Sequence, residues 1–101
     1  MKNSVRQMAT QMATIQNEID VAVDNGTLTD SQFRFKTDRL DNLRSNACDA
    51  LDRYCSDALR HSRRLGLASK SQLYTQIICK VRYNKPTADE LITIISSLFN
   101  F

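Results

Sequence analysis

The chain has 101 residues, of which 42% are hydrophobic and 25% are charged, and its formal net charge is +3. This composition is that of a folded globular chain rather than a disordered one, and no apolar run is long enough for a transmembrane helix. With two glycines and one proline, there is little turn chemistry for a β protein. We therefore expect one all-α domain over residues 1–101.

The first predicted helix spans residues 3–24. We expect its apolar seam to pack against the next helix, and the same seam would serve a homodimer. Met8 and Met12 would also suit an adaptable binding surface. The apolar residues recur at alternating steps of three and four, as in the a/d seam of a coiled coil: Val5, Met8, Met12, Ile15, Ile19 and Ala22.

The second predicted helix spans residues 29–65 and is the longest element. Thr29 and Gln32 fit a capping box at its start, and Gly66 fits a left-handed cap at its end. If continuous, it is about 55 Å long, so we expect either a long arm or a break. The favoured break is Ser45–Asn46, because both side chains compete for backbone hydrogen bonds. The predicted buried stripe is Phe33, Thr37, Leu40, Ala47, Leu51, Tyr54, Ala58, His61 and Leu65.

The link between these two helices is short and contains Gly26, a C-terminal cap residue. A short link makes consecutive helices antiparallel neighbours, so residues 3–65 are predicted to form a helical hairpin. The second helix outruns the first. Its far half must therefore be covered by the C-terminal helices or by a second chain.

Two shorter helices are predicted at the C-terminus, over residues 70–82 and 88–99, and Pro86 separates them. Ser69–Gln72 and Thr87–Glu90 fit capping boxes at their starts. The last helix is the most hydrophobic segment. We expect it to be buried against the third helix and the hairpin, and an oligomer interface is the alternative. The inward residues are predicted to be Leu73, Ile77, Ile78, Val81, Leu91, Ile94, Ile95, Leu98 and Phe99.

Few residues could carry catalysis or bind a metal. His61 is the single histidine, and it follows Asp57 by one helical turn with no third group to complete a catalytic set. Cys48 and Cys55 lie too far apart on one helix for a disulfide or a shared zinc ion. With Cys79 they make an odd number and are predicted to be reduced thiols.

No phosphate-binding loop or nucleophile elbow is present. We therefore expect no enzyme activity, no metal, no cofactor and no small-molecule substrate. The N-terminus has no apolar signal segment, and this absence and the reduced thiols favour the cytoplasm.

The one compositional anomaly is a basic segment over residues 58–88, which contains no acidic residue and has a net charge of +7. The rest of the chain has a net charge of −4. The candidate binding residues are the seven cations of this segment: Arg60, Arg63, Arg64, Lys70, Lys80, Arg82 and Lys85.

Three interpretations of this segment remain open. The charges are simply solvated, or they dock an acidic protein surface, or they bind nucleic-acid phosphates with Tyr74 or Tyr83 available for stacking. We favour a small helical binding protein that regulates or inhibits a larger protein machine. The alternative is mostly sequence-independent nucleic-acid binding through residues 58–88, since no exposed base-reading face is evident.

Overall fold

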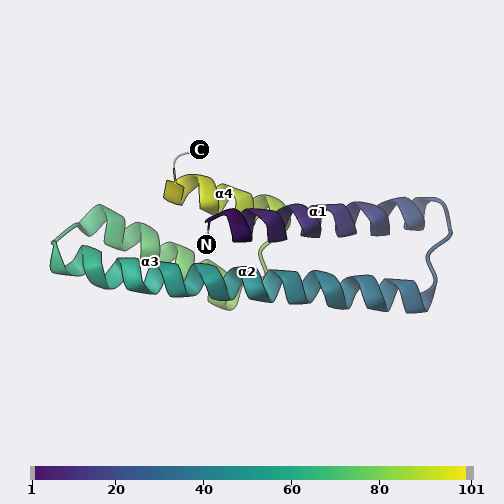
Figure 1. Cartoon of the computed structure of the whole chain (residues 1–101), viewed down its shortest axis with the longest axis horizontal. Helices are drawn as coiled ribbons and strands as arrows, with labels where there is room; N and C mark the ends of the chain where they lie inside the picture. The colour runs from purple at the N-terminus through teal and green to yellow at the C-terminus, as the bar shows by residue number, and fades with distance from the viewer. Residues whose placement is uncertain (1, 100–101) are drawn as a thin grey trace.

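The computed structural model describes residues 2–99, and within that range every regular element is an α-helix. The prediction of an all-α fold, with a hairpin, a long second helix and two shorter C-terminal helices, is confirmed. The molecule is a rod of 55 × 23 × 18 Å, and α2 runs along its whole length (Figure 1). The helices are α1 (Lys2–Asp24), α2 (Asp30–Arg64), α3 (Ala68–Tyr83) and α4 (Ala88–Phe99).

α2 is continuous through Ser45 and Asn46, so the predicted break there is wrong. Both side chains are exposed, where water satisfies them and they need not compete for helical hydrogen bonds. The flanking residues are held by the rest of the fold. Ala47 is fully buried, and Arg44 Nε donates a hydrogen bond of 2.9 Å to the carbonyl oxygen of Pro86.

The hairpin turn between α1 and α2 follows the predicted capping chemistry. Gly26 has a φ of +67°, and its N–H bonds the Val23 carbonyl at 3.1 Å. Such a left-handed glycine closes a helix because it has no Cβ to clash. At the start of α2, Thr29 Oγ1 accepts from the Gln32 backbone N–H at 3.2 Å. The Gln32 side chain accepts in return from the Thr29 backbone N–H at 3.3 Å. This capping box is confirmed.

α3 packs antiparallel along the far half of α2, which α1 does not reach (Figure 1). It begins at Ala68 after the N-cap Leu67, and no side chain caps it, so the predicted Ser69 capping box is wrong. The turn at Gly66, with a φ of +68°, lets α3 start before Ser69 is reached. Within the predicted box, Ser71 instead shares a hydrogen bond of 2.7 Å with Ser62 of α2.

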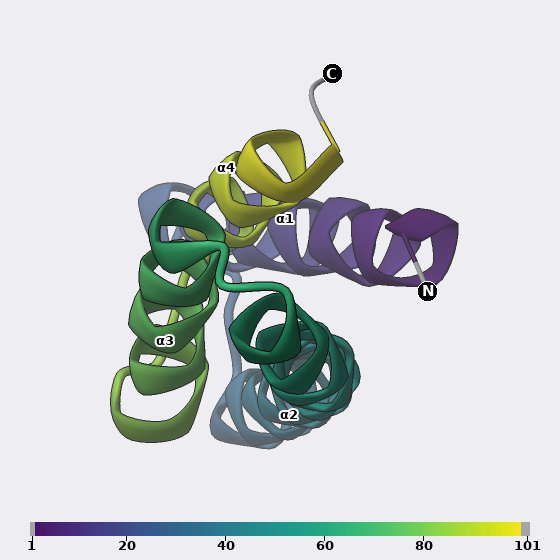
Figure 2. The ribbon, with the colours of Figure 1, turned by 90° about the vertical axis from the view of Figure 1, so that its left-hand side faces the viewer.

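α4 begins with the predicted capping box, in which the Glu90 backbone N–H donates to Thr87 Oγ1 at 3.2 Å. It runs antiparallel along α1 rather than pairing with α3. Seen end-on, α3 lies beside α2 and α4 lies next to α1 (Figure 2). The far end of α4 reaches α2, where the rings of Phe99 and Tyr54 are 5.4 Å apart.

The hydrophobic core is formed by all four helices. α1 places its seam inward, with Val5 and Met12 essentially inaccessible, so the seam that would serve a homodimer is used within the chain. Three of the predicted inward residues of α4 are also buried. The core residues are Val5, Ala9, Met12, Ile15, Ile19, Leu40, Ala47, Leu51, Cys55, Ile77, Val81, Leu91, Ile94 and Ile95.

The predicted stripe of α2 is wrong at both ends. Phe33 is 49% exposed and Leu65 is 59% exposed, because neither the first turns nor the last turn of α2 is covered by a further helix. His61 is also exposed. Its neighbour Ser62 takes the interior position, where its hydroxyl is satisfied by the Leu59 carbonyl and by Ser71.

Candidate docking surface

The seven predicted cations fall into two groups at opposite ends of α3. Arg60, Arg63 and Arg64 lie in the last turns of α2, and Lys70 lies in the first turn of α3. The other three, Lys80, Arg82 and Lys85, lie at the end of α3 and in the loop after it. α3 is 16 residues long, so the groups are about 20 Å apart.

The second group lies beside acidic residues of α2. Arg82 donates two hydrogen bonds to Asp52, of 2.8 and 3.0 Å, and Ser56 donates a third of 3.0 Å. The hydrogen bond from Arg82, with a lesser one from Ser56, holds the pKa of Asp52 below its ordinary value. Lys85 borders a surface depression with Asp49 of α2. Arg82 is therefore paired, whereas no carboxylate of residues 2–99 lies within 4 Å of Lys80 or Lys85.

The first group also contains one ion pair. Arg60 pairs with Asp57 at 2.7 Å, with both side chains largely exposed. For Arg63, Arg64 and Lys70, no carboxylate of residues 2–99 lies within 4 Å. The two arginines also occupy the last turn of α2, where cations complement the negative end of the helix dipole.

Two apolar side chains are exposed among these cations. Leu65 is 59% exposed and Leu67 is 39% exposed, and they flank Gly66 in the turn between α2 and α3. This exposed pair was not predicted, because Leu65 has the spacing of the predicted buried stripe of α2. The signal that could have found it is Gly66, since a residue next to a left-handed C-cap lies at the end of the helix. We call this surface the basic end: Arg63, Arg64, Leu65, Leu67 and Lys70.

The basic end rests on an ordered turn. The Leu67 backbone N–H bonds the Ser62 carbonyl at 2.9 Å, and the Gly66 N–H bonds the Arg63 carbonyl at 3.2 Å. This pair of bonds is a Schellman motif. The bond between Ser62 and Ser71 then ties the turn to α3. The exposed leucines are therefore held on a defined backbone.

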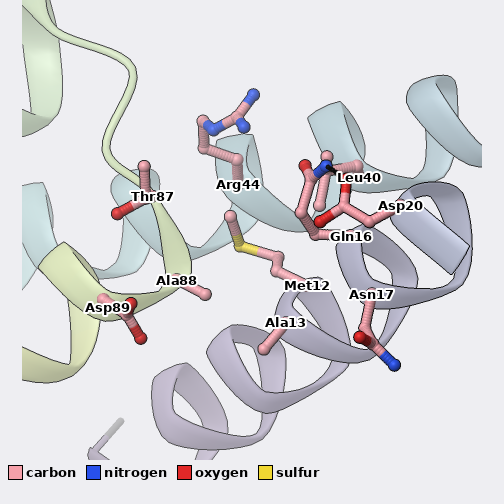
Figure 3. Close-up of a pocket in the computed structure, with 10 residues that line it drawn as sticks. All are labelled: Met12, Ala13, Gln16, Asn17, Asp20, Leu40, Arg44, Thr87, Ala88 and Asp89. Atoms are coloured by element: carbon pink, nitrogen blue, oxygen red, sulfur yellow. Dashed lines mark hydrogen bonds between the residues drawn. The ribbon is translucent and has the colours of Figure 1, made fainter. Parts of the chain in front are cut away.

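A separate pocket of about 420 Å³ lies between α1, α2 and the start of α4 (Figure 3). Several of its polar side chains have partners inside the chain. Arg44 bonds Asp41 at 2.7 Å as well as the Pro86 carbonyl, and Gln16 donates to Asp20 at 3.1 Å. The pocket's one hydroxyl, Thr87 Oγ1, accepts the capping hydrogen bond at the start of α4, and no histidine, cysteine, serine or lysine lines it.

The three thiols are free in the described structure. Burial raises the pKa of Cys55 to about 11, so this thiol is protonated and unreactive at neutral pH. Burial also raises the pKa of Cys48. Cys79 is exposed on α3. Within residues 2–99, no three histidine, cysteine or acidic side chains are grouped so that they could hold a metal ion.

No model of a known protein family matches the chain, and comparisons with curated proteins and with solved structures return no match. None of the helices in the described range combines the length and the apolar character that crossing a bilayer requires.

Proposed function

We propose that the protein is a non-enzymatic helical binding protein whose basic end docks on an acidic, partly apolar surface of a larger protein and so regulates or inhibits it. One observation carries the proposal. The exposed Leu65 and Leu67 lie among Arg63, Arg64 and Lys70, with no described carboxylate within 4 Å of these cations. Apolar anchors inside a charged rim are typical of protein interfaces. Free thiols fit a reducing compartment such as the cytoplasm.

Binding to nucleic acid has less support. Phosphate binding requires cations along a continuous track, with aromatic rings for stacking where the strand is single. Tyr83 is 80% exposed, but it lies at the other end of α3 from the basic end, and its neighbour Arg82 is engaged by Asp52. Tyr74 is half-buried against the core. The exposed leucines have no role in binding phosphates.

The proposal is tested by comparing the proteins cross-linked in cells by the native chain and by two charge-reversal variants. Arg63→Glu/Arg64→Glu should lose the partner, because reversed charge repels an acidic surface. Arg34→Glu/Arg39→Glu is the matched control. It changes the net charge equally, its arginines are exposed at the other end of the molecule, and it should keep the partner. Leu65→Ser/Leu67→Ser should also lose it.

A second arm measures fluorescence anisotropy of labelled single-stranded and duplex oligonucleotides at about 50 and 200 mM salt. We expect no binding at the higher salt. Oligonucleotide binding that persists there and is lost in Arg63→Glu/Arg64→Glu would replace the proposed function with the nucleic-acid alternative. Equal loss of the partner in the control variant would show that net charge, rather than the basic end, determines binding.

A further inference from the structure

The opposite end of the rod also exposes apolar side chains. It is formed by the last turns of α1, the turn at Gly26 and the first turns of α2 (Figure 1). Neither α3 nor α4 reaches this end, so only two helices pack there. Val21, Val23, Phe33 and Phe35 are between 49% and 67% exposed. These side chains lie in the two-helix part of the molecule, where no third layer covers them.

The charge of this end is negative. Residues 18–38 contain five acidic residues and two basic ones, for a net charge of −3. Lys36 pairs with Glu18 at 3.1 Å, whereas Asp24 and Asp30 have no cation of residues 2–99 within 4 Å. On each helix the two exposed apolar side chains are two positions apart, so they lie on different sides of this part of the rod. We call this part of the rod the acidic end: Asp20, Val21, Val23, Asp24, Asp30, Phe33 and Phe35.

Two of these carboxylates place negative charge toward the C-terminal end of α1, although Asp20 also accepts a hydrogen bond of 3.1 Å from Gln16. Asp20 and Asp24 belong to the last turns of α1, and that last turn contains no basic residue. Carboxylates near a helix C-terminus are repelled by the negative end of the helix dipole. The basic end shows the converse, with Arg63 and Arg64 at a helix C-terminus where they are favourable. These carboxylates therefore give an exposed apolar region a negative charge that the helix dipole does not favour.

The two ends are complementary. Each combines exposed apolar side chains with uncompensated charge, the signs are opposite, and they lie at opposite ends of a rod 55 Å long. We propose that the basic end of one copy docks on the acidic end of a second copy, so that the chains associate head to tail. Contacts made end to end leave one free surface at each end of the assembly and give an open chain, whereas an antiparallel side-by-side pair would close as a dimer. This inference rests on the proposed function, because it also uses the basic end as a protein-docking surface. The acidic end of a second copy is then one of the surfaces that the basic end binds.

The association is tested by sedimentation velocity and light scattering of the native chain over a wide concentration range, at about 50 and 200 mM salt. The average mass should rise with concentration at the lower salt and pass twice the monomer mass, and it should fall at the higher salt because exposed charges are screened. A mass that stays at the monomer, or that levels off at the dimer, would overturn the inference.

Charge-reversal variants identify the surfaces. Arg63→Glu/Arg64→Glu and Asp20→Lys/Asp24→Lys should each be monomeric alone. An equimolar mixture of the two should associate, because one variant then has two acidic ends and the other has two basic ends. Arg53→Glu/Lys80→Glu, the control for charge, alters two exposed side chains that belong to neither end and should associate like the native chain. Failure of the mixture to associate would overturn the inference.

The same variants distinguish a loss of association caused by unfolding from one caused by a changed docking surface. Asp20→Lys/Asp24→Lys removes carboxylates from a helix C-terminus, so its thermal midpoint should equal or exceed that of the native chain. Loss of association in a variant that is at least as stable cannot come from unfolding. Phe35→Ser, which alters a side chain that is 67% exposed, should weaken association without lowering the thermal midpoint. An unchanged association in Phe35→Ser would count against the acidic end as the docking surface.

The outcomes for self-association and for the proposed function are distinguishable. If the native chain is monomeric but Arg63→Glu/Arg64→Glu still loses a cross-linked partner, only the head-to-tail inference fails. If the native chain associates and no other protein depends on the basic end, the proposed regulator fails and self-association stands.

Discussion

Asp52 and Arg82 lie 30 positions apart in the chain, and their two hydrogen bonds set the register of α3 on α2. The Asp52 side chain is 28% exposed and that of Arg82 is 50% exposed, so solvent screens the pair and its contribution to stability is modest. Its geometric role is larger. A shift of α3 by one residue would rotate Arg82 away from Asp52 and move Ser71 away from Ser62.

The lowered pKa of Asp52 predicts a pH dependence. A carboxyl whose folded-state pKa lies below its unfolded value contributes stability above the unfolded pKa, and the contribution is lost as the pH falls through the folded pKa. Asp52→Asn should therefore lower the free energy of unfolding at about pH 7, and the difference from the native chain should shrink below about pH 4. Urea denaturation at several pH values measures it.

Asp57→Asn is the control for this prediction. Asp57 pairs with Arg60 within one helix, and its side chain is 75% exposed, so its substitution should have a smaller effect at every pH. A difference between the native chain and Asp52→Asn that is independent of pH would contradict the proposed cause, because the Asn side chain does not titrate in this range.

At the scale of the elements, glycine and threonine determine where the helices begin and end. Gly26 and Gly66 adopt positive φ at the two helix ends that precede a turn. Thr29 and Thr87 cap α2 and α4. Ser69 does not cap α3, because the turn at Gly66 already starts the helix at Ala68. The local motif for a capping box is therefore overridden where a tertiary turn fixes the backbone first.

Three alanine substitutions test this assignment. Thr29→Ala and Thr87→Ala should each lower the free energy of unfolding by about 0.5–2 kcal/mol, because each leaves a backbone N–H without its side-chain acceptor. Ser69→Ala should cost almost nothing, since alanine is the better helix former inside the first turn. Urea denaturation of the three variants measures these differences. A cost for Ser69→Ala equal to that of Thr29→Ala would show that Ser69 does cap the helix.

At the scale of the whole molecule, stability is unevenly distributed along the rod. Where α1 and α2 are joined by α3 and α4, Val5, Leu51 and Ile95 are fully buried. Toward the acidic end only α1 and α2 remain, and the most buried side chains there, such as Ile19, keep 7% exposure. Fewer buried contacts lower the free energy needed to open a helix locally.

Hydrogen exchange followed by mass spectrometry should report this gradient. Amides near Leu51 and Ile95 should exchange slowest, and those in the last turns of α1 and the first turns of α2 should exchange much faster. The measurement should be made at low protein concentration and high salt, where head-to-tail contacts are weakest. Uniform protection along α2 would contradict the gradient.

Much of the fold could be predicted from the sequence because its signals are local. The glycines, Pro86 and the threonine caps mark the helix boundaries, and the seam of α1 marks its buried face. The wrong predictions depend on what covers a residue. Phe33 and Leu65 have the spacing of core residues, but no helix lies over the ends of α2. Ser45 and Asn46 have the composition of a break, but packing around them keeps α2 continuous.

The candidate surface likewise depends partly on the local sequence and partly on contacts between distant residues. The +7 charge of residues 58–88 is a property of the sequence, but its distribution in space is not. Asp52 offsets Arg82 only because α3 folds back on α2 in one register. Leu65 belongs to the surface only because the turn at Gly66 places it beyond the last buried turn. The first relation is not encoded by neighbouring residues, whereas the second is signalled by Gly66, which directly follows Leu65.

The unbroken course of α2 has a consequence for the angle between the two ends. A helix advances about 100° and 1.5 Å per residue, so the number of residues between Asp30 and Arg64 sets the azimuth of one end relative to the other. One residue more or fewer in α2 would change this azimuth by about 100°. Seven inserted residues would nearly restore the azimuth while lengthening the rod by about 10 Å. α2 therefore fixes the helical pitch of any head-to-tail chain that the protein forms.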